Sequence, residues 1–277
     1  PENMPPAAIL DELTHRGVKT LYLQTGLWTL QGDMINPAAM GAFVDLAHQR
    51  GMDVIGWYLP GFADLERDVR RSLAVLTFRS PSGGGFDGFA PDIEDSTEVG
   101  GDQSRFNAGI AEYSRRLRAS VPPGTVLGAI VPDARNNERA PGGWAGFPWP
   151  EIGRNFDVIL PMAYWSVTKN PAACRTIQMD AASYIRDVVA KTAALMGIER
   201  PMHPIGGIAD CNTAEEIAGY AAAVRDTGSI GGSLYDFVTN NDTPLKDALW
   251  GALGSINALI PQPAAPPAEK STPAGIN

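Results

Sequence analysis

The stretch FDGFAPDIE, residues 86–94, decides the fold. Side chains of an extended strand alternate between two faces, so Gly88, Ala90, Asp92 and Glu94 share one face, opposite bulky apolar residues. A face that runs from small residues to two acids is typical of a strand that crosses the interior of a (β/α) barrel and ends at its mouth. The stretch therefore predicts such a barrel, with Asp92 and Glu94 at its working end.

Apolar, β-rich runs recur along the chain, and a segment with helical periodicity follows each of them. This alternation predicts repeated βα units around a parallel sheet. The predicted strands are residues 18–24, 53–59, 86–93, 125–131, 157–164, 201–208 and 231–238. The predicted helices are residues 36–50, 62–78, 103–119, 149–155, 181–196, 213–226 and 243–257. We therefore expect an α/β fold, the (β/α)8 TIM barrel, with one of its strands not yet accounted for.

The two ends of the chain fall outside this alternation. Residues 5–19 predict a helix that ends at Gly17, before the first predicted strand. Because a barrel helix normally follows a strand, we expect the first barrel strand to lie upstream of Pro1. The last stretch, PQPAAPPAEKSTPAGIN, buries little apolar surface and predicts a Pro/Ala-rich tail or linker. The expected organisation is a barrel at residues 1–260 and a tail at residues 261–277.

Composition narrows the classes of partner. A formal net charge of −9 argues against nucleic acid and anionic membrane surfaces, because no basic field is present to attract them. The longest uncharged apolar run, residues 248–260, is too short to cross a bilayer. The two cysteines and three histidines lack the spacing of a zinc site, so we expect no metal and no other cofactor. We expect a monomer.

Asp92 and Glu94 suit proton transfer. Two residues apart on one strand face, they would lie about 6–7 Å apart at the usual rise per residue. Mutual repulsion and partial burial raise the pKa of one such acid, which then stays protonated and can donate to a glycosidic oxygen. The alternative is that both are solvated or ion-paired loop residues.

A family resemblance supports the catalytic interpretation. Asp87, Gly88, Asp92 and Glu94 form the pattern D-G-x-x-x-D-x-E, which resembles the fourth-strand signature of glycoside hydrolase family 18, the chitinase-like barrels. In that family the final Glu is the general acid. The Asp two residues before it orients and stabilises the acetamido group of the substrate, which attacks the anomeric carbon. The resemblance implies these roles for Glu94 and Asp92, and a carbohydrate substrate.

A second stretch, PMAYW, carries the resemblance further. Met162 and Tyr164 look like the Met-x-Tyr of the family's sixth strand, whose Tyr contacts the reacting acetamido group. The sequence also departs from the family, since Ala90 and Trp165 stand where it usually has Asp. We therefore expect a glycosidase that cleaves a polysaccharide or glycan. A barrel that binds carbohydrate without cleaving it stays open as the alternative.

Other strand ends offer a second catalytic carboxylate, at Asp133, Asp210 or Asp236. Asp236 is preferred because its strand closes the barrel. A partner about 5 Å from Glu94 would indicate a retaining mechanism, and one about 6.5–9.5 Å away an inverting mechanism. Each of these acids has an equally simple alternative role, which is to tie a loop.

Aromatic side chains near the strand ends suggest a carbohydrate groove, because sugar rings stack on aromatic planes. For any one of them, core packing is the more frequent alternative. The predicted substrate-binding residues are Tyr164, Trp165, Tyr58, Trp57, Tyr235 and Asp133.

Three further features bear on the surroundings of the site. Residues 132–150 form a long loop rich in Gly and Pro that is suited to wall or cover the mouth. Cys174 and Cys211 follow neighbouring strands, so a disulfide between them is one of two alternatives; a bridge would favour export. Abundant Arg, Ala and Gly hint at a bacterial source. We expect a secreted or cell-surface protein, with a cytoplasmic location as the alternative.

Overall fold

The computed structural model describes residues 4–135, 144–165, 180–207, 212–238 and 244–257. Within these residues strands alternate with helices, as the sequence predicts. The strands are β1 (Thr20–Leu27), β2 (Asp53–Leu59), β3 (Gly88–Pro91), β4 (Gly128–Val131), β5 (Val158–Pro161), β6 (Ile205–Gly206) and β7 (Ser233–Leu234). The helices are α1 (Pro6–His15), α2 (Pro37–His48), α3 (Leu65–Thr77), α4 (Gln103–Ser120), α5 (Trp149–Asn155), α6 (Ala181–Met196), α7 (Ala214–Asp226) and α9 (Lys246–Asn257), with a 3₁₀ turn, η1 (Thr97–Val99).

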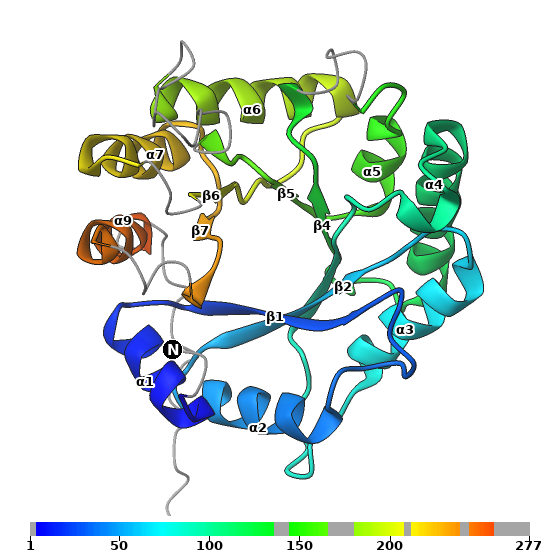
Figure 1. Cartoon of the computed structure of the whole chain (residues 1–277), viewed down its shortest axis with the longest axis horizontal. Coiled ribbons are helices and arrows are strands. Elements are labelled where there is room, and N and C mark those ends of the chain that lie inside the picture. Colours follow the sequence, from blue (N-terminus) through cyan, green and yellow to red (C-terminus); the bar gives the residue numbers. More distant parts are fainter. Residues whose placement is uncertain (1–3, 136–143, 166–179, 208–211, 239–243, 258–277) are drawn as a thin grey trace, which may run out of the picture.

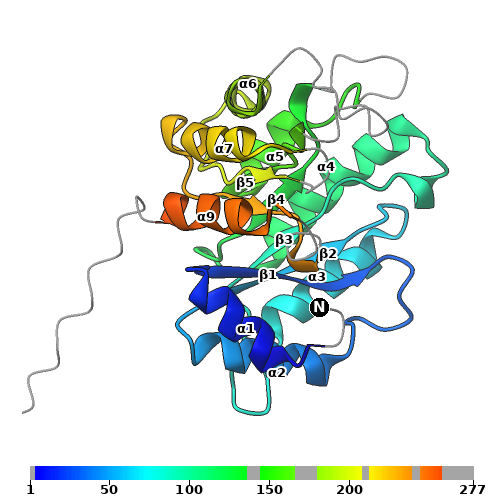
Figure 2. The ribbon, with the colours of Figure 1, turned by 60° about the vertical axis from the view of Figure 1, so that its left-hand side comes forward.

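The strands run parallel and follow one another in chain order. Continuous ladders join β1 to β2 to β3, β4 to β5, and β6 to β7. Single bridges complete the order, from β3 to β4 through Phe89–Leu127 and from β5 to β6 through Ile159–Met202. The strands surround a central axis and the helices lie outside them (Figure 1), an arrangement that the turned view confirms (Figure 2). The predicted α/β barrel architecture is therefore confirmed.

Several strands are shorter than predicted, and proline is a physical reason. Proline has no backbone N–H to donate to a ladder. β3 ends at Pro91 and β5 at Pro161, while Pro204 directly precedes the two-residue strand β6. Strand existence and order were thus predicted more accurately than strand length.

The alternation predicted for residues 86–94 is also confirmed. Ala90 belongs to a small apolar cluster inside the barrel, whereas Phe89 and Ile93 belong to the large cluster that packs strands against helices. The inner cluster is formed by Ala90, Ile130, Leu160, Met162 and Ile205, with half-buried Tyr22, Ile55, Trp57, Val158 and Tyr164 against it. The interior below Asp92 is thus apolar.

The first acid of the D-G-x-x-x-D-x-E pattern has a structural role. Asp87 precedes β3, where its Oδ2 accepts hydrogen bonds from Val54 N at 2.7 Å and from the His48 ring at 2.9 Å. The same arrangement recurs before β5, where Asp157 Oδ2 accepts a hydrogen bond from Leu127 N at 2.9 Å. Asp87 therefore joins β2 and β3 at the end of the barrel opposite the mouth.

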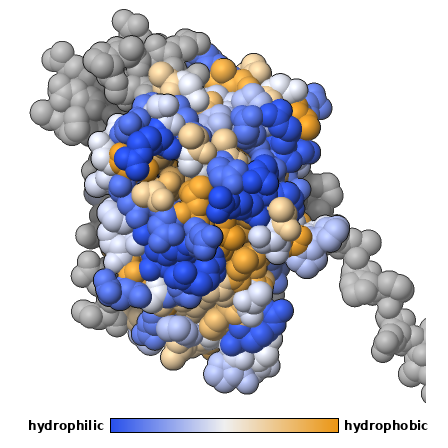
Figure 3. All heavy atoms as spheres, turned by 90° about the vertical axis from the view of Figure 1, so that its right-hand side faces the viewer, coloured by the Kyte–Doolittle hydropathy of each residue, from blue (hydrophilic) through white to orange (hydrophobic). Residues whose placement is uncertain are grey.

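The outer shell is held by ordinary helix chemistry. Polar side chains accept from the third N–H of several helices, which satisfies donors that the helix itself leaves unpaired. These caps are Asn36, Asp64, Asp102, Asp180 and Thr213. The surface over α3 and α4 is largely hydrophilic, with apolar patches between (Figure 3). Among the described helices, none combines the length and apolar character needed to traverse a bilayer. The tail at residues 261–277 lies outside the described residues.

Gly56 offers a test of packing between β2 and α3. A Cβ at this position would lie 2.4 Å from Val75 Cγ1, 3.1 Å from Thr25 Cγ2 and 3.2 Å from Phe86 Cδ1. Gly56→Ala is therefore expected to lower the free energy of unfolding by about 1–3 kcal/mol. Gly251→Ala in α9 is the control, because nothing lies within 4 Å of its Cβ position. Urea unfolding measures both, and equal losses would contradict the packing argument.

Candidate functional site

Asp92 lies at the point where β3 leaves the barrel. Its backbone forms a bridge with Ile130 of the neighbouring strand β4, and its N–H donates to Tyr58 O of β2 at 2.8 Å. The main chain at Asp92 is therefore fixed from both sides. The side chain is only 8% exposed, and its Oδ1 has no hydrogen-bond partner within the described part of the chain. Glu94 follows two residues later and is exposed. A buried, incompletely paired acid beside an exposed one is an arrangement suited to chemistry.

Both acids bind their protons more tightly than usual. The pKa of Asp92 is raised well above its ordinary value, first by burial and then by the charge of Glu94. The pKa of Glu94 is also raised, first because the surrounding protein removes part of the hydration of its carboxyl, although the side chain still reaches solvent, and then because Asp95 is negative. The two acids interact, so they titrate as a pair. This pair can hold a proton at a pH where isolated carboxyls are ionised.

Tyr164, Tyr235 and Asp236 complete a group at the carboxyl ends of β3, β5 and β7. The tyrosine rings lie 6.0 Å apart between centroids, and the Tyr235–Asp236 peptide bond is cis. Burial raises the pKa of Tyr164, and the charges of Asp92, Glu94 and Asp236 raise it further. Desolvation likewise raises the pKa of Tyr235, with the same three acids contributing. We call Asp92, Glu94, Tyr164, Tyr235 and Asp236 the mouth cluster.

Trp57 lies next to this cluster on the inner face. In β2 it is paired in register with Ala90 of β3, and its half-buried side chain packs against the inner apolar cluster. The small side chain at position 90 therefore has a large aromatic neighbour within the inner apolar cluster. An acid at position 90 would face this apolar surface, which is consistent with its absence here.

Three residues predicted to bind substrate have other partners. Tyr58 donates to Asp68 Oδ1 of α3 at 2.6 Å, and Trp165 stacks on Tyr220 of α7 with ring centroids 5.1 Å apart. Asp133 Oδ2 accepts a hydrogen bond from the hydroxyl group of Tyr184 in α6. In β2, Tyr58 follows the inward-facing Trp57, so alternation turns it toward the helices. Trp165 lies beyond the end of β5, directly after Tyr164, and is buried against α7. Other predicted features, Asp210, Cys174, Cys211 and residues 136–143, lie outside the described residues.

Asp95, which directly follows Glu94, is a polar residue that sequence reasoning missed. Trp28 Nε1 donates to Asp95 Oδ2 at 2.8 Å, and Thr97 N donates to Asp95 Oδ1 at 2.8 Å. Burial alone would raise the pKa of Asp95, but these hydrogen bonds outweigh it and hold the pKa below its ordinary value. The D-x-T pattern at residues 95–97 was an available signal, because Asp often accepts from the backbone two residues on.

Deeper in the barrel, His203 faces Tyr22, with ring centroids 5.4 Å apart. Burial lowers the pKa of His203 to about 4, so the imidazole is neutral near pH 7. Its Nε2 has no hydrogen-bond partner within the described residues. Across those same residues, no group of three or more His, Cys, Asp or Glu side chains is placed to hold a metal ion.

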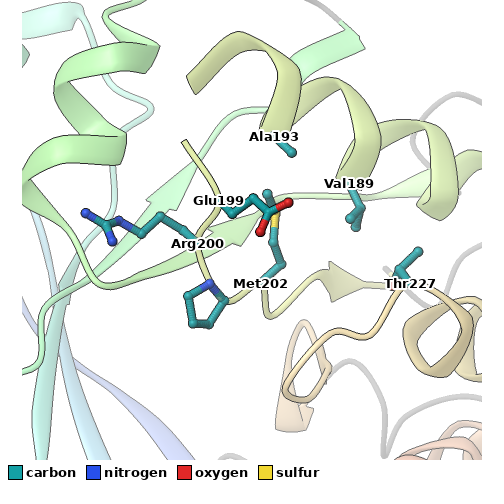
Figure 4. Close-up of a pocket in the computed structure, with 7 residues that line it drawn as sticks. Val189, Ala193, Glu199, Arg200, Met202 and Thr227 are labelled. Atoms are coloured by element: carbon teal, nitrogen blue, oxygen red, sulfur yellow. The ribbon is translucent and has the colours of Figure 1, made fainter. Parts of the chain in front are cut away.

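A shallow depression of about 380 Å³ lies at the opposite end of the barrel. Figure 4 shows Val189 and Ala193 on one side of it and Glu199 and Met202 below. Arg200 is turned away, and its Nε donates to a backbone carbonyl before β5, that of Gly153, at 2.7 Å. This depression borders the start of β6, whereas the mouth cluster lies at the strand ends, so the two are separate.

Burial of Asp92 predicts a pH-dependent cost in stability. The pKa of Asp92 is higher in the folded protein than in the unfolded chain. As far as this group is concerned, the stability of the fold is therefore greatest below the pKa of an unfolded aspartate, where Asp92 is protonated in both states, and it decreases as the pH rises through the pKa of the folded protein. Asparagine cannot ionise. Asp92→Asn is therefore expected to raise Tm near neutral pH and to change it little below about pH 4. Thermal unfolding at both pH values checks this, and a pH-independent difference in Tm would contradict it.

Comparison with known proteins supports the fold. No family model matches the chain, and no curated protein matches its sequence. Solved structures do match. They include a chitinase from Chromobacterium violaceum (15% identity, 91% of this chain and 95% of that chain, TM-score 0.62). They also include an endo-1,4-beta-D-mannanase from Thermotoga petrophila (13% identity, 90% of this chain and 94% of that chain, TM-score 0.63). A third is the spore cortex-lytic enzyme SleL of Bacillus cereus (9% identity, 91% of this chain and 70% of that chain, TM-score 0.63).

These matches extend over 90–91% of this chain, and by their names the three proteins are a chitinase, a mannanase and a cortex-lytic enzyme. At 9–15% identity the likeness shows the fold that they share. The predicted resemblance to chitinase-like barrels is therefore confirmed as a structural resemblance. The chemistry of this chain has to be argued from its own side chains.

Proposed function

We propose that this chain is a glycoside hydrolase that cleaves a polysaccharide or glycan by general acid/base catalysis at the mouth cluster. The observation that carries the proposal is the pair Asp92 and Glu94, whose pKa values are both raised at the mouth of this barrel. Such a pair supplies a carboxylic acid that stays protonated near neutral pH. The resemblance to solved glycoside hydrolases supports the choice of substrate class.

Glu94 is the proposed general acid because it is the exposed member of the pair. Its proton passes to the glycosidic oxygen as the bond from that oxygen to the anomeric carbon breaks. That carbon is attacked either by the Asp236 carboxylate or by a water molecule whose proton Asp236 takes. In the first case the ionised Glu94 then takes a proton from the water molecule that hydrolyses the bond between the sugar and Asp236. Asp92, buried beneath, is the proposed electrostatic partner that orients the reacting sugar.

Asp236 is the proposed second carboxylate. Its charge acts on Tyr164 and Tyr235, as do the charges of Asp92 and Glu94, so the three acids share one neighbourhood. An acid in this place can attack the anomeric carbon directly or take a proton from an attacking water. Tyr164 keeps its hydroxyl proton near neutral pH, as a phenol does, and its raised pKa extends this to alkaline pH, so it can donate a hydrogen bond to the sugar.

The proposed substrate-binding surface is aromatic. Tyr235 is 45% exposed and Tyr164 lies beside it, while Trp57 lines the inner wall. Aromatic planes accept the apolar faces of sugar rings, and the hydroxyl groups of the tyrosines supply polar contacts at the rim. Tyr58, Trp165 and Asp133 are left out of this proposed surface, because each of them contacts a side chain of an outer helix.

The direct test is a screen of glycans for hydrolysis. The purified chain is incubated with chitin oligosaccharides, β-mannans and peptidoglycan, and new reducing ends are measured over time. Hydrolysis of at least one substrate is the expected result. Binding of a glycan without any new reducing end would overturn the proposal and favour the non-catalytic carbohydrate-binding barrel.

A further inference from the structure

Asp95, the residue after Glu94, is held from two sides. Its Oδ2 accepts from the indole Nε1 of Trp28 at 2.8 Å and its Oδ1 from the backbone N–H of Thr97 at 2.8 Å. Trp28 comes from the loop after β1, so this contact joins segments 67 residues apart in the chain. Both carboxyl oxygens are thus engaged, and the charge of Asp95 has a fixed position.

The residues that hold Asp95 are themselves fixed by α3. Arg71 donates to the backbone oxygens of Leu27 and Trp28, each at 2.9 Å. On the other side of the loop, Arg67 binds Glu98 through two hydrogen bonds of 2.5 and 2.6 Å. The segment after Glu94 is therefore anchored at both ends to one helix.

We propose that Asp95 is a positioning residue of the site, a fixed negative charge that keeps the neighbouring Glu94 in its protonated, proton-donating form. The inference deepens the proposed function and rests on it only for the kinetic measurement below. Asp95 itself needs no contact with the substrate, since it acts through Glu94.

The other titratable groups of the mouth cluster are less suited to supply a negative charge that favours the protonated form of Glu94. Asp92 is buried and favours its own neutral form. Tyr164 and Tyr235 are neutral near pH 7, as phenols ordinarily are, and their pKa values are raised further. Asp236 lies across the mouth, where it acts on the two tyrosines. Asp95 is different, because its two hydrogen bonds favour the ionised carboxylate. Partial burial of its carboxyl is the larger cause of the raised pKa of Glu94, and the negative charge of the adjacent Asp95 raises it further.

Three variants separate charge from anchoring. Asp95→Asn removes the charge and keeps an oxygen that can accept from Thr97. Asp95→Ser also removes the charge and keeps a hydroxyl acceptor for a similar turn, in case the first variant does not fold. Trp28→Phe removes the indole N–H and leaves the charge of Asp95 in place.

The primary readout is direct titration of the Glu94 carboxyl by ¹³C NMR, with the signal assigned by its loss in Glu94→Gln. The Glu94 titration midpoint is expected to move to lower pH in Asp95→Asn and in Asp95→Ser. It is expected to stay unchanged, or to rise, in Trp28→Phe. The alkaline limb of the kcat/KM profile should move in parallel, because that limb reports the acid of the free enzyme.

Two results would overturn the inference. One is a Glu94 midpoint that is unchanged when the charge of Asp95 is removed. The other is an equal downward movement in Trp28→Phe, which would show that Asp95 serves only as an anchor. If the wild type cleaves no glycan, the proposed function fails, but the titration still decides whether Asp95 controls Glu94.

Discussion

Glu94→Gln is expected to lower kcat by about 10²–10⁴-fold, since this is the usual contribution of a positioned general acid or base. Glutamine has nearly the same shape as glutamic acid but cannot transfer a proton. Affinity for glycan should change little, because aromatic surfaces of the mouth such as Tyr235 remain. Initial rates on the substrate found by screening, with binding measured by calorimetry, check both expectations.

The matched control is Glu112→Gln on α4. Glu112 binds Arg115 and Arg116 on the outer surface of the barrel, so its loss should leave turnover unchanged. Full activity of Glu94→Gln would contradict the assignment of Glu94 as general acid. Loss of activity in both variants would instead indicate a general fault in folding, which unfolding curves would reveal.

Asp68→Ala is expected to give the largest loss of stability, about 3–5 kcal/mol in the free energy of unfolding. Asp68 is fully buried in α3. It accepts from Tyr58 Oη at 2.6 Å, from Phe62 N at 2.9 Å and from Arg67 Nη2 at 2.8 Å. Its removal leaves the buried donors of Tyr58 and Phe62 without their acceptor and takes one carboxylate partner from the partly buried Arg67. Each of these changes carries a desolvation cost.

Urea unfolding of Asp68→Ala should be compared with that of Asp226→Ala. Asp226 pairs with Arg186 at 2.6 Å between α7 and α6, and both side chains are about half exposed, at 54% and 47%. An exposed ion pair contributes about 0–1 kcal/mol, so this control should unfold nearly as the wild type does. A similarly small effect of Asp68→Ala would show that the buried network does not stabilise α3.

The order of the βα units could be predicted from the sequence, because period-2 and period-3.6 apolar patterns are local properties of the chain. Residues 53–59 were predicted as a strand and form β2 with the same bounds, and residues 149–155 and 181–196 are the helices α5 and α6. Strand lengths were overestimated where proline occurs. A pattern of apolar residues does not reveal that Pro91 and Pro161 lack the backbone N–H that would continue a ladder.

For the candidate site, alternation along residues 86–94 indicated which face of β3 carries the acids, and the inner cluster around Ala90 agrees with it. Neighbouring aromatic residues at the strand ends also point in opposite directions. In Trp57–Tyr58 and Tyr164–Trp165 one member faces inward and the next packs against a helix. Composition suggested a groove of aromatics, but only half of each pair is available to it.

What the sequence by itself determined is the alternation of strands and helices, the inner face of β3 and the presence of Asp92 and Glu94 at its end. These follow from local geometry and need no partner. The tertiary structure alone decided which charges surround Glu94. Trp28 and Asp95 meet across 67 residues, and the acids of β3 act on the tyrosines beyond β5 and β7. Proton affinity depends on burial and on neighbouring charges, and both arise only when distant strands come together.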